Sequence, residues 1–207
     1  PGDFIPMLEE TGLIEPVGKW ILEEALRQGK AWHRAGWPGM RMAVNLSPRQ
    51  FQSRQLLNQI TSALEETDFP EDQLELEITE SLLVEDSAAL HRTFQILQAM
   101  GIELSLDDFG TGYSALTYLH RFPLHTLKID RGFVNGIGHS RQSEELLRGI
   151  VQLGQALQMN VVAEGIENAD HMDFLRQSPG LRGQGFGLAR PIAGEAVQAM
   201  LEAQCHG

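Results

Sequence analysis

The chain has few of the residues that mark secreted, membrane-spanning or nucleic-acid-coating proteins. Its 207 residues include one cysteine, Cys205, which excludes an internal disulfide and suits a reducing compartment. No apolar run approaches the roughly 20 residues that a bilayer requires, and the N-terminus has no signal-peptide pattern. With 28 acidic and 16 basic residues, the formal charge of −12 argues against binding to duplex nucleic acid. We expect a cytoplasmic domain with no membrane contact of its own, alone or within a membrane-anchored parent.

Two common nucleotide-binding signatures are also missing. No Gly-x-Gly-x-x-Gly turn opens an early helix, and no Walker sequence is present. An acidic chain that nevertheless binds a phosphate ester needs metal ions to offset the charge repulsion.

Helical and strand-like segments alternate along the chain, and no linker or low-complexity tract divides it. Strands are expected near residues 41–45, 74–79, 102–107, 127–130, 160–164 and 183–186. Helices are expected near residues 15–35, 48–66, 86–100, 141–158 and 168–177. This alternation predicts parallel strands, arranged as a doubly wound sheet or as a closed (β/α) barrel.

Polar residues at the predicted strand ends favour the barrel. Each predicted strand places one polar residue at its C-terminal end, namely Asn45, Glu77, Asp107, Lys128, Glu164 and Gln184. Barrel enzymes build their sites from a ring of strand ends, whereas a doubly wound sheet gathers ligands at a single crevice. The sequence therefore predicts one α/β domain over residues 1–207, with a TIM-like barrel of which about six strands are present.

Asp107 and Asp108 form the most informative of these ends, because they follow an apolar strand and precede the glycine-rich stretch 109–112. Adjacent side chains on a regular strand point to opposite faces, so we expect the strand to end there if both carboxylates converge on one site. A solvated Asp-Asp turn is the alternative. A divalent cation is the usual reason to hold two like charges together.

The chemistry predicted for this ring is that of hard, oxygen-ligated cations, Mg²⁺ or Mn²⁺, since no Cys or His stands at the strand ends. Two ions that share Asp107 would activate a water for in-line attack at phosphorus, with Lys128 adding a positive charge. The predicted ligands are Asn45 and Glu77 on one side of Asp107, and Asp108 and Glu164 on the other.

Seven ordered motifs over the whole chain resemble the EAL-domain family of bacterial cyclic di-GMP phosphodiesterases. They are the segments 4–14, Asn45-Leu-Ser-Pro-Arg-Gln-Phe51, Glu75-Leu-Glu-Ile-Thr-Glu-Ser81, Asp107-Asp-Phe-Gly-Thr-Gly-Tyr-Ser114, Leu127-Lys-Ile-Asp-Arg131, Ala163-Glu-Gly-Ile-Glu167 and Gln184-Gly-Phe186. The resemblance implies an eight-stranded (β/α) barrel that opens cyclic di-GMP to linear pGpG with two Mg²⁺ or Mn²⁺ ions. GGDEF-type or sensory domains in the parent chain are compatible with it.

The resemblance also implies roles for individual residues. Lys128, with Asp108 and Glu164, belongs to the catalytic group, and Lys128 positions the attacking water. Gln184 binds substrate, and Glu80 anchors the loop after Asp108, a loop that couples a homodimer interface near residues 107–112 to the metal site. Asp130 and Glu167 are expected just outside the ligands.

One departure bears on catalysis. The Glu-Ala-Leu motif that names the family precedes the segment with which this chain begins, so we expect a missing part with two strands, a metal-ligating glutamate and an arginine. Glu24-Ala25-Leu26 is a false match, because it falls inside a predicted helix. Two alternatives therefore stay open: a cyclic di-GMP receptor without activity, and an enolase-type barrel metalloenzyme.

Overall fold

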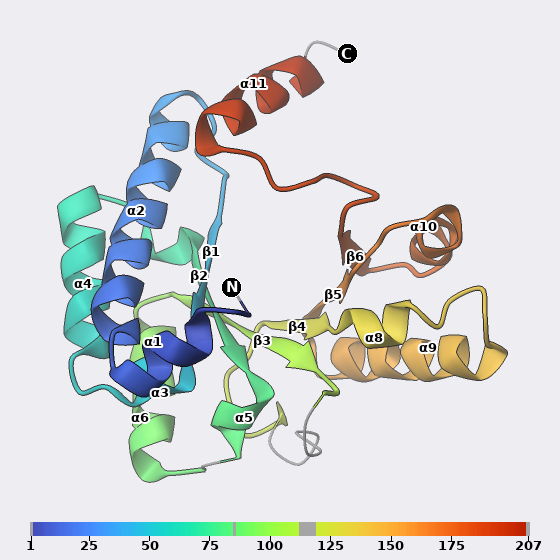
Figure 1. Ribbon diagram of the computed structural model, residues 1–207, viewed down its shortest axis with the longest axis horizontal. Coiled ribbons are helices and arrows are strands. Elements are labelled where there is room, and N and C mark those ends of the chain that lie inside the picture. Colours follow the sequence, from blue (N-terminus) through green and yellow to red (C-terminus); the bar gives the residue numbers. More distant parts are fainter. Residues whose placement is uncertain (1, 85, 112–118, 206–207) are drawn as a thin grey trace. The chain divides into compact units, whose positions relative to one another are not determined.

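The computed structural model describes residues 2–84, 86–111 and 119–205 (Figure 1). The chain divides into two compact units. The first comprises residues 1–78, 87–103 and 192–207, and the second comprises residues 79–86 and 104–191. Among the described residues, no helix is both long and apolar enough to cross a membrane.

The first unit contains most of the helices of the N-terminal half and the C-terminal helix. These are α1 (Ile5–Thr11), α2 (Ile14–Arg34), α3 (Pro48–Gln52), α4 (Leu56–Thr67), the 3₁₀ turn η1 (Glu71–Gln73), α6 (Ala88–Ala99) and α11 (Gly194–Cys205). Its strands β1 (Met42–Leu46) and β2 (Leu74–Thr79) pair in parallel, with the last residue of β2 counted in the second unit. Helix α2 packs against α4, as Figure 1 shows, and buries Leu26 completely.

The second unit contains four parallel strands in chain order. They are β3 (Glu103–Phe109, its first residue counted in the first unit), β4 (Thr126–Ile129), β5 (Asn160–Glu164) and β6 (Leu181–Gln184). Its helices are α5 (Glu80–Leu83), α8 (Arg131–Val134), α9 (Arg141–Ala156) and α10 (Ala169–Arg176). Gly154 lets α9 approach β5, since a Cβ there would lie 2.5 Å from the side chain of Val161.

All six predicted strands are present, and some boundaries differ from the sequence prediction. The helix expected over residues 48–66 is two helices, because Ser53 is extended and ends α3. The last strand begins at Leu181, two residues earlier than expected, and ends at Gln184, the residue predicted at its C-terminal end. Helix α11 was not predicted; the Nε1 of Trp32 donates to the carbonyl of Gly194 at its first residue, at 3.2 Å.

His125 ties the starts of β3 and β4 together. Its Nδ1 accepts from the backbone N–H of Leu104 at 3.2 Å, and its own N–H donates to the Leu104 carbonyl at 2.8 Å. The two strands are therefore held in register on the N-terminal side of the site.

Candidate functional site

A β-bulge in β3 brings Asp107 and Asp108 to the same site. Leu106 pairs with Leu127 and Phe109 pairs with Ile129, so three steps along β3 match two steps along β4. The extra residue breaks the alternation of side chains, which lets two adjacent carboxylates converge. The prediction that the strand ends at Asp107 is therefore wrong: β3 continues to Phe109, and the bulge does what a strand end was expected to do.

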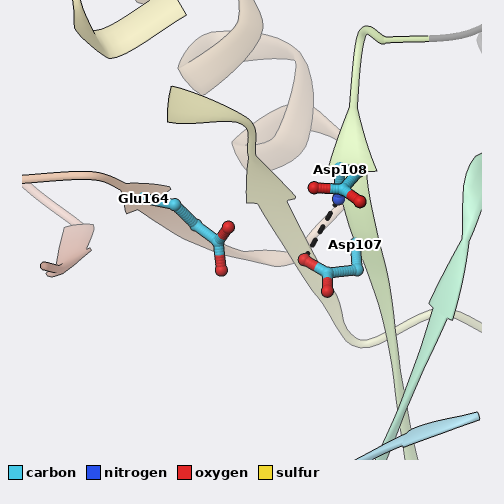
Figure 2. A group of neighbouring side chains, drawn as sticks. All are labelled: Asp107, Asp108 and Glu164. Atoms are coloured by element: carbon cyan, nitrogen blue, oxygen red, sulfur yellow. Dashed lines mark hydrogen bonds between the residues drawn. The ribbon is translucent and has the colours of Figure 1, made fainter. Parts of the chain in front are cut away.

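Asp108 adopts a left-handed backbone conformation with φ of 55°, which is uncommon for a residue with a side chain. Its N–H donates to Oδ1 of Asp107 at 3.0 Å, as the dashed line in Figure 2 marks. The N–H and hydroxyl of Thr111 both donate to the Asp108 carbonyl, at 3.2 and 2.9 Å. Local hydrogen bonds thus hold a conformation that costs free energy, as is common at functional sites.

The loop after Asp108 is held from two sides. The N–H of Gly110 donates to Oε2 of the buried Glu80 at 3.2 Å. Gly110 has φ of 96°, and a Cβ there would lie 2.3 Å from the ring of Phe133. The contact is compatible with the loop-anchoring role predicted for Glu80. Gly112, at the end of the segment predicted to lie near a dimer interface, falls outside the described residues, as do Tyr113 and Ser114.

Lys128 lies between two of the predicted ligands. Its Nζ is 3.1 Å from Oδ1 of Asp107 and 2.8 Å from Oε1 of Glu164, and the residue is 5% exposed. An ammonium group at this depth is stable because two carboxylates compensate its charge. Lys128 thereby holds carboxylates of β3 and β5 on either side of β4.

Asp107, Asp108 and Glu164 form a cluster that fits a divalent cation. One carboxylate oxygen from each lies within 4.8 Å of the others, and Figure 2 shows the three side chains gathered at the ends of their strands. Burial and the negative charge of Asp107 raise the pKa of the Asp108 carboxyl, with a further contribution from Asp130. A hard cation with oxygen ligands would relieve this repulsion, so the donor set suits Mg²⁺, Mn²⁺ or Ca²⁺.

The loop that carries Glu164 is locked by a histidine that the sequence analysis gave no such role. His171, which is 3% exposed, places Nδ1 3.2 Å from both the N–H of Glu167 and the carbonyl of Gly165. Its own N–H donates to Oδ1 of Asn168 at 2.9 Å, which caps α10. The signal available in the sequence was a histidine three residues after an N-cap asparagine.

A cavity of about 440 Å³ opens beside the cluster. It is lined by Asp108, Asp130, Arg131, Glu164, Gly165, Glu167, Gln184, Gly185 and Phe186. Asp130 and Glu167, expected just outside the ligands, and Gln184, expected to bind substrate, therefore line the same cavity as Asp108. Phe186 was quoted only as part of a motif, without a role.

In the first unit, Asn45 and Glu77 are brought together by regular pairing. They are direct partners in the parallel register of β1 and β2, with Glu77 buried and Asn45 exposed. Arg49 at the start of α3 donates to the carbonyl of Glu9 in α1. Glu24 is an exposed residue of α2 that pairs with Arg27, as expected for a false motif match.

The comparisons with known proteins agree on one family. The EAL domain family model matches residues 1–191. The chain is 42% identical over 199 residues to the Pseudomonas aeruginosa protein named bifunctional diguanylate cyclase/cyclic di-GMP phosphodiesterase MucR, covering 96% of this chain and 29% of MucR. It spans less than a third of the length of MucR and of two further curated relatives that it matches.

Two solved structures show the fold. The PaMucR phosphodiesterase in its c-di-GMP complex aligns with a TM-score of 0.90 and 42% identity, over 95% of this chain and 80% of that chain. The Klebsiella pneumoniae BlrP1 calcium/cy-diGMP complex aligns with a TM-score of 0.76 and 27% identity, over 86% and 44% of the two chains. The predicted EAL-type α/β barrel fold is confirmed, and the enolase-type alternative loses its support. The chain belongs to the EAL domain family.

Proposed function

We propose that this domain hydrolyses cyclic di-GMP to linear pGpG with divalent cations held by its strand-end carboxylates. The observation that carries the proposal is the cluster of Asp107, Asp108 and Glu164, with Lys128 at its base and the 440 Å³ cavity beside it. The names of the relatives and structural neighbours, which are cyclic di-GMP phosphodiesterases or cyclic di-GMP complexes, support the substrate.

Two Mg²⁺ or Mn²⁺ ions would complete the proposed site. Asp107, Asp108 and Glu164 would hold a cation in the second unit, and Asn45 and Glu77 of the first unit stay predicted ligands. A bound cation supplies charge neutralisation at phosphorus and makes a water molecule more acidic. Amide and carboxylate oxygens favour hard cations, which supports Mg²⁺ or Mn²⁺ at these residues.

The reaction adds one water across one of the two phosphodiester bonds. The water oxygen forms a bond to phosphorus, the P–O3′ bond breaks, and the released 3′ oxygen takes a proton, which leaves a 5′-phosphate on pGpG. Lys128 orients the attacking water with an N–H of its ammonium group and offsets the charge that develops at phosphorus. Asp108 and Glu164 belong to the same catalytic group, because their carboxylates would hold the cation and accept hydrogen bonds. Gln184 would contact the substrate from the cavity wall.

The test is turnover of cyclic di-GMP by the purified full-length protein, which is expected to supply the Glu-Ala-Leu glutamate, followed by chromatography of the nucleotides with Mg²⁺ and with EDTA. Asp107→Asn and Glu164→Gln are each expected to reduce turnover by roughly a hundredfold or more, as is EDTA. Asp173→Asn is the matched control, because it removes an equal charge from an exposed ion pair with Arg176 in the same unit.

The outcomes separate the open possibilities. Full turnover by Asp107→Asn would overturn the metal-site assignment. Tight binding of cyclic di-GMP without pGpG formation by the wild type would instead favour the receptor alternative. The homodimer, a cytoplasmic location, and fused sensory or GGDEF-type domains in the full-length protein stay predictions.

A further inference from the structure

Phe186 is a solvent-exposed aromatic residue that lines the cavity. It follows Gln184 and Gly185 at the end of β6, lines the same cavity as Asp108 and Glu164, and is 53% exposed. Leaving a phenylalanine half in water forgoes hydrophobic stabilisation of roughly 1 kcal/mol. An exposed aromatic ring inside a polar, acidic cavity is therefore a candidate for ligand contact.

The ring is held in place by a tight backbone contact. The N–H of Ile166 donates to the carbonyl of Gln184 at 3.0 Å, and the N–H of Gly187 donates to the carbonyl of Ile166 at 2.8 Å. A Cβ at Gly185 would lie 2.3 Å from the Ile166 nitrogen, so only glycine permits this approach. Phe186 is thus fixed between two glycines that dock on the loop carrying Glu164.

Arg190 adds a cation to this ring. Its Cζ lies 4.9 Å from the ring centroid of Phe186, within the range of a cation–π contact. The N–H groups of Leu188 and Ala189 both donate to the carbonyl of Gly185, at 3.0 and 3.1 Å, so the intervening backbone is a single compact turn. A planar ring has two faces and the guanidinium covers only one of them. Phe186 is still 53% exposed despite this contact, so ring surface remains in water.

We propose that Phe186 is the stacking platform for one guanine base of the dinucleotide, with Arg190 holding the ring from behind. The inference rests on the proposed function and adds a specificity-determining residue to it. Aromatic side chains stack on nucleobases through their π faces, whereas the acidic cluster beside them serves the phosphate through cations. Phe186 therefore acts in substrate binding, and the carboxylates act in bond cleavage.

The test compares steady-state kinetics of Phe186→Ala, Phe186→Leu and Phe186→Tyr on cyclic di-GMP with Mg²⁺. Removal of the ring in the first two variants is expected to raise KM roughly tenfold or more, with kcat changed less than about twofold. Phe186→Tyr keeps the aromatic face and is expected to retain the wild-type KM. Thermal unfolding of each variant verifies that the loop remains folded.

Leu188→Ala is the matched control, because Leu188 is 47% exposed on the same turn and does not line the cavity. An unchanged KM in Phe186→Ala overturns the inference, and so does a wild-type KM in Phe186→Leu, which would show that apolar bulk suffices. Failure of the wild type to hydrolyse cyclic di-GMP overturns the proposed activity alone. In that case the same tenfold difference is expected in the Kd for cyclic di-GMP, and absence of binding by the wild type overturns both.

Discussion

Asp68 in the first unit and Asp108 in the second adopt the same unusual backbone conformation in opposite surroundings. Their φ angles are 54° and 55°. Asp68 is the C-cap of α4, where a left-handed residue ends a helix. Asp108 occupies the bulge inside β3. The same local geometry thus terminates an element in one unit and redirects a side chain in the other.

The pKa values of the Asp68 and Asp108 carboxyl groups are shifted in opposite directions. A hydrogen bond from Lys30 and the positive charge of that residue lower the pKa of Asp68. Burial and the charge of Asp107 raise the pKa of Asp108, although the nearby Lys128 acts in the other direction. Both aspartates have an uncommon backbone conformation, but only their neighbours decide the role of the side chain. Asp68 pairs with a lysine and stabilises the fold, whereas Asp108 lies beside a second carboxylate and is suited to bind a cation.

The largest expected effect is a loss of folding stability when the lysine beside the Asp107 and Glu164 carboxylates is removed. Lys128→Met should lower the free energy of unfolding by about 3 kcal/mol in EDTA, because it leaves the carboxylates of Asp107 and Glu164 close together without a counter-charge. Mg²⁺ should restore more stability to this variant than it adds to the wild type. Urea unfolding with and without Mg²⁺ measures both quantities.

Lys30→Met is the control for that experiment. The side chain of its partner Asp68 is 85% exposed, so the remaining carboxylate stays hydrated and the loss should be much smaller. Equal losses in the two lysine variants would contradict the difference between the regions.

The second expected effect concerns backbone strain. Asp108→Gly should raise the free energy of unfolding by about 1 kcal/mol in EDTA, since glycine tolerates a positive φ and the substitution removes a repulsive charge. Asp68→Gly has the same backbone relief but loses the hydrogen bond from Lys30, so its gain should be smaller or absent. A larger gain for Asp68→Gly would reverse the comparison. Chemical denaturation of both variants provides the measurement.

The smallest expected effect is a pH dependence that belongs to Asp68. Because its folded-state pKa lies below the ordinary value of 3.8, Asp68 contributes stability that is present above pH 3.8 and is lost as the pH falls through the folded pKa. The Tm of the wild type should exceed that of Asp68→Asn at pH 6, and the two should converge well below pH 3.8. High salt should shrink the difference at pH 6, because the ion pair is exposed. A constant difference across this range would exclude the ion pair as its source.

Several site positions followed from the sequence because strand periodicity identifies the residues at strand ends. Asn45 and Glu77 are register partners, as expected for neighbouring parallel strands. Glu164 and Gln184 are register partners as well. Where strands pair regularly, the residue pattern of each strand is enough to predict which residues lie at its end. The local sequence therefore predicted these positions.

Other features depended on contacts between distant segments. The bulge arises from the pairing of β3 with β4, and no glycine or proline inside Leu-Asp-Asp-Phe indicates it. The loop of Glu164 is locked by His171 and by the Gln184–Gly187 turn, which approach it from α10 and β6. The break at Ser53 lacks glycine or proline, so the helical pattern appeared continuous.

The sequence by itself determined the order of strands and helices, the polar residue at each strand end and the oxygen-rich character of the ligands. Those properties follow from residue type and periodicity, which act locally. Only the tertiary structure decided that Asp107 and Asp108 converge on Glu164, and that Phe186 stands exposed beside them. The convergence requires a register shift, and the exposure requires two glycines docked on another loop, and both depend on the backbone of segments far away in the chain.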